Sequence, residues 1–153
     1  MHIPLLRAAY LAAAMRLFRP EGGDVEELAL AIDASNATDT EAEWLAAIAF
    51  RESTFVTSAI GDHGESFCAF QLHMPGGVRT REGWSGEDLA ADATKCVTVA
   101  LRHLRRSFIH CANLPAHERL AAYATGTCLS ARGRRISADR DHIRRMMFEG
   151  GRR

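Results

Sequence analysis

The chain lacks the features that would assign it at once to several large classes of protein. Its 153 residues contain no run approaching the ~20 apolar residues of a membrane-spanning helix, so no membrane span is expected. They contain no internal repeat and no low-complexity tract. A chain of this length buries roughly two-thirds of its unfolded surface, which is enough for one core. We therefore expect a single domain.

Sequence motifs that hold metal ions are also missing. The four cysteines are widely spaced and form no Cys-x-x-Cys, which argues against a zinc knuckle. The histidines form neither His-x-x-x-His nor His-x-x-Glu-His. We expect neither a metal nor another cofactor, and we assign the histidines to surface or capping positions.

The cysteines fit either disulfides or free thiols. Cys96 and Cys111 lie about 22 Å apart if one helix joins them, which is too far for a bond. Cys111 can reach Cys128, because the intervening Asn-Leu-Pro turn lets the chain double back. Cys68 would then bond Cys96. Two disulfides suit a protein outside the cytoplasm, whereas four buried thiols suit a reducing compartment. We favour at least the bond between Cys111 and Cys128.

The N-terminal residues do not have the pattern of a signal peptide. An apolar patch over residues 8–15 has neither a basic segment before it nor the length of a signal's apolar region. We expect an amphipathic helix over residues 3–17, ended by the Pro-Glu-Gly-Gly segment. A short second helix is expected over residues 24–32.

Charge is unevenly spread along a chain whose net charge is zero. Residues 21–43 hold only acidic charges, and arginines dominate from residue 132 onward. The arginines could bind a polyanion, or they could form a solvated last helix docked on the acidic segment. We favour the helix, because no aromatic residues interleave the arginines as single-strand nucleic-acid binding requires. A nucleic acid is therefore not the expected partner.

The third expected helix places a carboxyl group on its apolar face. Thr40 and Glu43 have the spacing of a capping box. Trp44 and Ile48 recur at i, i+4, and the next position of that stripe is Glu52. A partly desolvated carboxyl there holds its proton more tightly than in water, which suits a general acid near neutral pH. Alternatively, Glu52 lies at the rim of the stripe and meets solvent.

Later elements are expected to be mostly helical. Ser85 with Asp88 is expected to cap a long helix. Pro115 suits the first turn of the next helix, which runs through Tyr123. Ser137 is expected to cap the last one. Short strands are expected only between residues 56 and 73, around the glycines of that segment.

Three segments follow one another in an order that resembles a known superfamily. They are Glu-Ser-Thr-Phe at residues 52–55, Gly-Asp-His-Gly leading to Cys-Ala-Phe-Gln over residues 61–71, and Ala-Tyr-Ala-Thr-Gly at residues 122–126. This order resembles the soluble lytic transglycosylases and goose-type lysozymes of the lysozyme-like superfamily. The resemblance covers about residues 40–130.

The resemblance implies a mainly α, α+β lysozyme-like fold, in which a helical domain has one small β-hairpin that lines a cleft. Residues 40–130 would be the catalytic core. Residues 1–39 would be a helical segment packed on this core, and residues 131–153 a basic C-terminal helix of the same domain.

The resemblance also assigns roles to particular residues. Glu52 would be the catalytic acid. In a transglycosylase the same carboxylate then acts as a base on the muramic acid 6-hydroxyl, so one carboxylate is enough. A hydrolase needs a second carboxylate, ~6.5–9.5 Å away for inversion. Asp62 is the candidate for that role, or it is a turn residue that bonds its own loop.

Four further residues are expected to line the cleft. Ser53 and Ser66 would hydrogen-bond Glu52 or the substrate. Gln71 would contact sugar amides or the surroundings of the acid. Tyr123 would lie across the cleft from Glu52, although a buried core tyrosine has the same sequence pattern.

The expected function is cleavage of the MurNAc-GlcNAc bond in peptidoglycan glycan strands, with a transglycosylase favoured over a hydrolase. Such an enzyme acts at the bacterial cell wall, in the periplasm or outside the cell. Without a signal it would reach the wall through lysis, a holin-like route or a virus particle.

The alternative is a catalytically inactive lysozyme fold in a virion or envelope assembly, with glycan or neighbouring proteins as partners. Two departures from the family pattern favour this alternative. Residues 68–70 replace the family's Gly-Leu-Met, and Ala124 replaces its Asn. A third interpretation is a helical nucleic-acid-binding protein.

Overall fold

The computed structural model describes residues 4–150 and confirms a mainly helical fold with a small antiparallel sheet. The helices are α1 (Pro4–Phe18), α2 (Val25–Ala34), α3 (Asp39–Ser53), α4 (Gly86–Ala91), α5 (Ala93–His110), α6 (Ala121–Thr125) and α7 (Ala131–Phe148). The strands are β1 (Ile60–Gly61), β2 (Ser66–Phe67) and β3 (Leu72–His73). Single 3₁₀ turns lie at Asp62–Gly64, Pro75–Gly77 and Ala116–Glu118.

The sheet has three strands where the sequence predicted one hairpin. β2 pairs with both β1 and β3 in antiparallel register, with Phe67 opposite Ile60 on one side and Leu72 on the other. Two residues in the turn between β2 and β3 adopt the left-handed conformation, Cys68 with φ 63° and Gln71 with φ 47°. These residues reverse the chain, so a second hairpin forms directly after the first.

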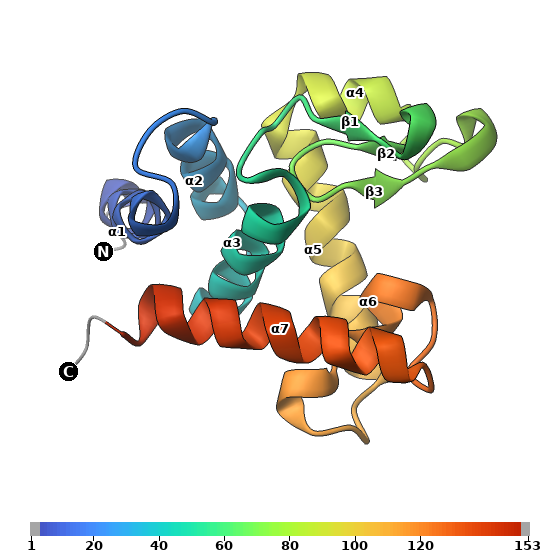
Figure 1. The fold of residues 1–153 in the computed structure, drawn as a ribbon. Coiled ribbons are helices and arrows are strands. Elements are labelled where there is room, and N and C mark those ends of the chain that lie inside the picture. The colour runs from blue at the N-terminus through green and yellow to red at the C-terminus, as the bar shows by residue number, and fades with distance from the viewer. Residues whose placement is uncertain (1–3, 151–153) are drawn as a thin grey trace.

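Helices α3 and α5 pass through the centre of the molecule, with the other elements around them (Figure 1). The sheet lies beside α4 at one end of α5, and α6 and α7 pack together at the other end. Helix α7 also packs across α3, and α1 packs on α2. The sheet and the α6–α7 pair therefore lie on opposite sides of the C-terminal end of α3.

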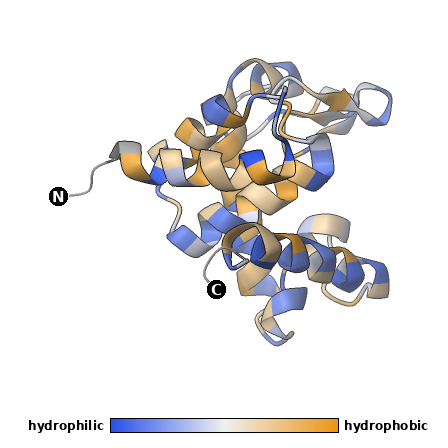
Figure 2. Ribbon diagram, turned by 60° about the vertical axis from the view of Figure 1, so that its left-hand side comes forward, coloured by the Kyte–Doolittle hydropathy of each residue, from blue (hydrophilic) through white to orange (hydrophobic). Residues whose placement is uncertain are grey.

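One continuous hydrophobic core joins these helices and the sheet. The expected stripe on α3 is confirmed, since Trp44 and Ile48 are both buried. Figure 2 shows apolar residues where the helices face one another and also along α1. Helix α1 buries Leu11 and Met15 but exposes Leu6 and Leu17, so it is apolar on more than one side.

Two expected helix caps were wrong. The capping box of α3 is formed by Thr38 and Glu41, two residues before the expected pair of Thr40 and Glu43. Glu41 also pairs with Arg105 of α5, so the earlier register is fixed by a tertiary contact that spacing alone does not show.

The last helix, α7, is capped by Ser130, seven residues before the expected cap at Ser137. Ser137 is buried inside α7. It accepts a hydrogen bond from the Leu120 amide at 3.0 Å and donates one to the His117 carbonyl at 2.7 Å. Its hydroxyl therefore joins α7 to the segment before α6.

The predicted long helix is two helices. The capping box of Ser85 and Asp88 is present and begins α4. The chain leaves helical geometry at Asp92, whose side chain accepts from the Lys95 amide and begins α5. Aspartate is common at such a capping position, because its carboxylate accepts a hydrogen bond from an amide of the first turn that has no partner within the helix. The helix expected from Pro115 through Tyr123 is likewise a 3₁₀ turn followed by α6.

Both expected disulfides are present. Cys68 of the turn after β2 bonds Cys96 of α5, and Cys111 at the end of α5 bonds Cys128. The bonds hold the sheet to one end of α5 and the segment after α6 to the other. Disulfides of this kind are typical of proteins in oxidising surroundings. None of the helices in residues 4–150 has the length and apolar character of a membrane span.

Most acidic residues of the acidic segment are paired with arginines elsewhere in the molecule. Acidic residues between positions 21 and 43 pair with arginines of α1, α5 and α7, namely Asp33 with Arg7, Glu26 with Arg16, Glu41 with Arg105 and Glu43 with Arg144. The arginine-rich end forms α7 and docks on α3. One of its arginines, Arg144, pairs with Glu43 of the acidic segment, which agrees with a last helix docked there.

Candidate active site

A cleft of about 830 Å³ lies between the sheet and the α6–α7 pair. Five of the six residues that the resemblance selected as site residues line it together, namely Glu52, Asp62, Ser66, Gln71 and Tyr123. Ligand-binding sites of proteins are concave surfaces in which a few polar groups converge. The cleft is therefore the candidate active site.

Glu52 lies in the last turn of α3 and opens into the cleft. Its side chain keeps 30% of its surface exposed, as the rim interpretation predicted. Its Oε1 atom accepts a hydrogen bond from Arg140 Nη2 of α7 at 2.9 Å. The carboxylate therefore has a cationic neighbour as well as the apolar stripe that the sequence indicated.

The ion pair between Glu52 and Arg140 belongs to a row of alternating charges between α3 and α7. Arg140 also bonds Asp139 at 2.8 Å, and Asp139 bonds Arg51 at 2.9 Å. Burial alone would raise the pKa of Asp139, but the hydrogen bonds from Arg51 and Arg140 lower it below its ordinary value. Arg140 is thus held from both sides, by Asp139 and by Glu52.

The Glu-Ser-Thr-Phe segment turns the chain sharply after α3. Thr54 and Phe55 both have positive φ, and the Phe55 side chain is fully buried. Ser53 does not line the cleft. Its hydroxyl donates to the Ala69 carbonyl at 2.8 Å and accepts from the Val56 amide at 3.1 Å. Ser53 therefore fixes the end of α3 against the turn after β2, close to Glu52.

On the sheet side, the expected residues bond mainly to their own loops. Asp62, exposed and at positive φ, accepts a hydrogen bond from the buried Ser66 hydroxyl, as its turn interpretation predicted. Gln71 donates from Nε2 to the carbonyls of Ala59 at 3.2 Å and Cys68 at 3.0 Å. These bonds hold β1 to the turn after β2, and they orient both side chains along the cleft wall.

Tyr123 lies on the opposite wall, on α6. Its ring packs against the core, and its hydroxyl is buried with no hydrogen-bond partner among the described residues. Burial and the nearby Glu52 carboxylate raise the pKa of Tyr123 far above its ordinary value, so it stays protonated. Both sequence interpretations of this residue therefore hold in part, since Tyr123 packs in the core and also faces Glu52.

Sequence reasoning missed Arg140, the residue in direct contact with Glu52. The arginines of the C-terminal segment were considered only as a group. Arg140 and Glu52 are 88 positions apart, and no local pattern distinguishes Arg140 from its neighbours. His103 of α5 and Arg132 of α7 also line the cleft and were not expected there.

Comparison with protein-family models, with curated proteins and with solved structures found no match for this chain.

Proposed function

We propose that the cleft binds peptidoglycan glycan strands and that Glu52 is the acid that cleaves them, in a lytic transglycosylase or muramidase. The observation that carries the proposal is the placement of Glu52. A partly exposed carboxyl at the end of a helix faces a cleft that Asp62, Gln71 and Tyr123 also line.

In this mechanism Glu52 donates a proton to the glycosidic oxygen as positive charge develops on the sugar. Glu52 must carry that proton on a carboxyl oxygen, and Arg140 Nη2 already donates a hydrogen bond to its Oε1. The glycan is therefore expected to displace Arg140 from Glu52 when it enters the cleft. Asp139 retains Arg140 when this happens, because it already bonds the guanidinium.

A single carboxylate then suffices for a transglycosylase, since the substrate's own 6-hydroxyl takes the place of water. A hydrolase would use Asp62 to position water, and Asp62 would have to do so while it accepts the Ser66 hydroxyl. The disulfides support action outside the cytoplasm. We propose the bacterial cell wall, or a virion that reaches it, as the place of action.

A second candidate function is glycan binding without cleavage, in a virion or envelope assembly. The ion pair between Glu52 and Arg140 favours it, because a permanently paired carboxylate cannot act as an acid. Ala124, which lines the cleft where the family has Asn, favours it also.

Digestion of purified sacculi, with the products identified by mass spectrometry, separates these functions. The wild type is expected to release anhydromuramyl ends, and Glu52→Gln is expected to release none. Glu26→Gln is the matched control, because it is the same substitution in a helical glutamate that pairs with an arginine but does not line the cleft.

Reducing ends in place of anhydro ends would establish a hydrolase. Binding of chitotetraose without release of fragments, by the wild type and by Arg140→Gln, would establish the non-catalytic function. Absence of both binding and release would overturn the proposal.

A further inference from the structure

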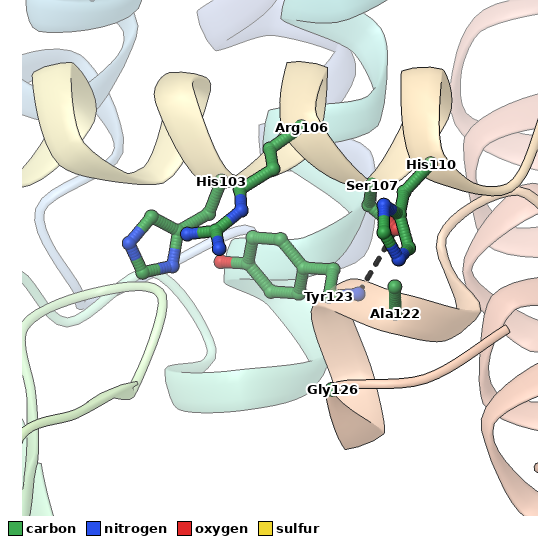
Figure 3. Close-up of a pocket in the computed structure, with 7 residues that line it drawn as sticks. All are labelled: His103, Arg106, Ser107, His110, Ala122, Tyr123 and Gly126. Atoms are coloured by element: carbon green, nitrogen blue, oxygen red, sulfur yellow. Dashed lines mark hydrogen bonds between the residues drawn. The ribbon is translucent and has the colours of Figure 1, made fainter.

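A second, smaller pocket of about 250 Å³ adjoins the cleft and shares His103, Tyr123 and Gly126 with it. We call it the basic pocket; its other lining residues are Arg106, Ser107, His110 and Ala122. His103, Arg106 and His110 lie at i, i+3 and i+7 on α5, so they project from one face of that helix. Figure 3 shows His103 and Arg106 projecting toward the hydroxyl end of Tyr123.

The charge of this pocket is not compensated by its own residues. None of its lining residues is acidic. Two other arginines of the same helix are paired, Arg102 with Glu82 and Arg105 with Glu41. Arg106, by contrast, has no ion pair or hydrogen bond within the part of the chain that the structure describes. A cation at the mouth of a pocket, with no anion from the protein, is available to an anion from a ligand.

Of the other polar groups of the pocket, one hydroxyl already has hydrogen-bond partners among the described residues and one has none there. The Ser107 hydroxyl is occupied, since it accepts from the Tyr123 amide at 3.0 Å and donates to the Arg119 carbonyl at 2.8 Å. The Tyr123 hydroxyl is unoccupied although it is buried. A buried polar group without a partner destabilises the protein, because it has lost its hydrogen bonds to water and gained none in return. An oxygen of a bound anion would accept a hydrogen bond from this hydroxyl and remove that destabilisation.

From these groups we infer that the basic pocket binds a carboxylate of the peptide branch carried by a glycan strand in the cleft. Arg106 would bind the carboxylate with its planar fork, and the Tyr123 hydroxyl and the imidazole N–H groups would donate to it. A pocket of this volume admits the end of a branch, while the cleft beside it takes the sugars. The inference rests on the proposed function for the identity of the ligand.

The test is an NMR titration of the histidine ring signals in the full chain with four separate probes. These are L-alanyl-γ-D-glutamic acid, its diamide, inorganic phosphate and chitotetraose. The acidic dipeptide is expected to shift His103 and His110, whereas the diamide is expected to shift neither. Arg106→Gln should weaken dipeptide binding about tenfold or more, because a charge-assisted hydrogen bond contributes about 1.5–3 kcal/mol.

Arg102→Gln is the matched control, since it removes the same charge from the same helix outside the pocket. Equal weakening by both variants would indicate a general effect of charge and overturn the inference. It would also be overturned if the diamide bound as well as the acid, or if the dipeptide did not bind. Tighter binding of phosphate than of dipeptide would exclude the peptide branch as the ligand.

Chitotetraose separates this inference from the proposed function. If the dipeptide binds and chitotetraose does not, the inference of a carboxylate site in the basic pocket is supported and the proposal that the cleft binds glycan is overturned. If chitotetraose alone binds, the proposal of a glycan-binding cleft is supported and the inference about the basic pocket is overturned.

Discussion

The two walls of the cleft hold their polar side chains in different ways. On the sheet wall, the side chains of Asp62 and Gln71 form hydrogen bonds within their own loops. On the α6–α7 wall, Arg140 reaches across to Glu52, and the Tyr123 hydroxyl has no partner among the described residues. Asp62 and Gln71 thus mainly stabilise the sheet wall, whereas the helical wall presents groups that a ligand can engage.

The largest expected effect comes from the disulfide that ties each wall to α5. Replacing Cys68 and Cys96 with alanine should cost about 3.5 kcal/mol of unfolding free energy, and replacing Cys111 and Cys128 about 3 kcal/mol. The first loop is longer, with a separation of 28 residues against 17, so its closure removes more entropy from the unfolded chain. Urea unfolding of both double variants measures the difference.

Hydrogen exchange in the same variants would locate the effect. Loss of the Cys68–Cys96 bond should raise exchange in the sheet, and loss of the Cys111–Cys128 bond should raise it around α6. Equal exchange in both regions for both variants would show that the walls are not independently held.

The next effect concerns Gln71, whose amide supports the sheet wall. Gln71→Ala should destabilise the fold by about 1–2 kcal/mol, because two side-chain hydrogen bonds to the Ala59 and Cys68 carbonyls are lost. Both carbonyls keep a backbone donor, which limits the cost. Thermal unfolding measures the change. An unaltered stability combined with lost glycan binding would instead assign Gln71 to ligand contact.

Tyr123→Phe should change the free energy of unfolding by less than Gln71→Ala does, and in the opposite direction. It removes a buried hydroxyl that has no partner in residues 4–150, so stability should be unchanged or should rise by up to about 1 kcal/mol. Binding of the acidic dipeptide should weaken in the same variant. A clear loss of stability would mean that the hydroxyl is satisfied within the protein, and the contrast between the two walls would not hold.

Local patterns predicted much of the fold, and tertiary contacts determined the rest. The buried stripe of Trp44 and Ile48 follows from helical spacing, so α3 and the position of Glu52 could be predicted. The cap at Thr38 could not, because Thr38–Glu41 and Thr40–Glu43 have the same spacing. The contact with Arg105 distinguishes them only in the folded chain.

The candidate site divides in the same way. The sequence segments around Glu52, Asp62 and Gln71 were predicted to share one cleft, and they do, because each lies at a turn that begins or ends an element. Arg140 lies in the middle of a helix rich in arginine, and only the crossing of α7 over α3 brings it to Glu52. Sequence spacing contains no information on that crossing.

The smallest expected effect concerns Glu82, in the loop that follows the sheet wall. Its hydrogen bond with Arg102 of α5 lowers the pKa of Glu82 from 4.5 to about 2. A carboxyl with a lowered pKa stabilises the folded state above its unfolded pKa. That contribution should therefore be complete above about pH 4.5 and be lost as the pH falls toward about 2. Because both side chains are near the surface, salt should screen the effect.

Urea midpoints of the wild type, Glu82→Gln, Arg102→Gln and the double variant, measured between these pH values, isolate this pair. Each single variant should lose stability at pH 6 and show a flatter dependence on acid than the wild type. The double variant should lose no more than either single variant, since one interaction is removed in all three. Additive losses would mean that Arg102 and Glu82 act separately, and that the loop is not fastened to α5 by their ion pair.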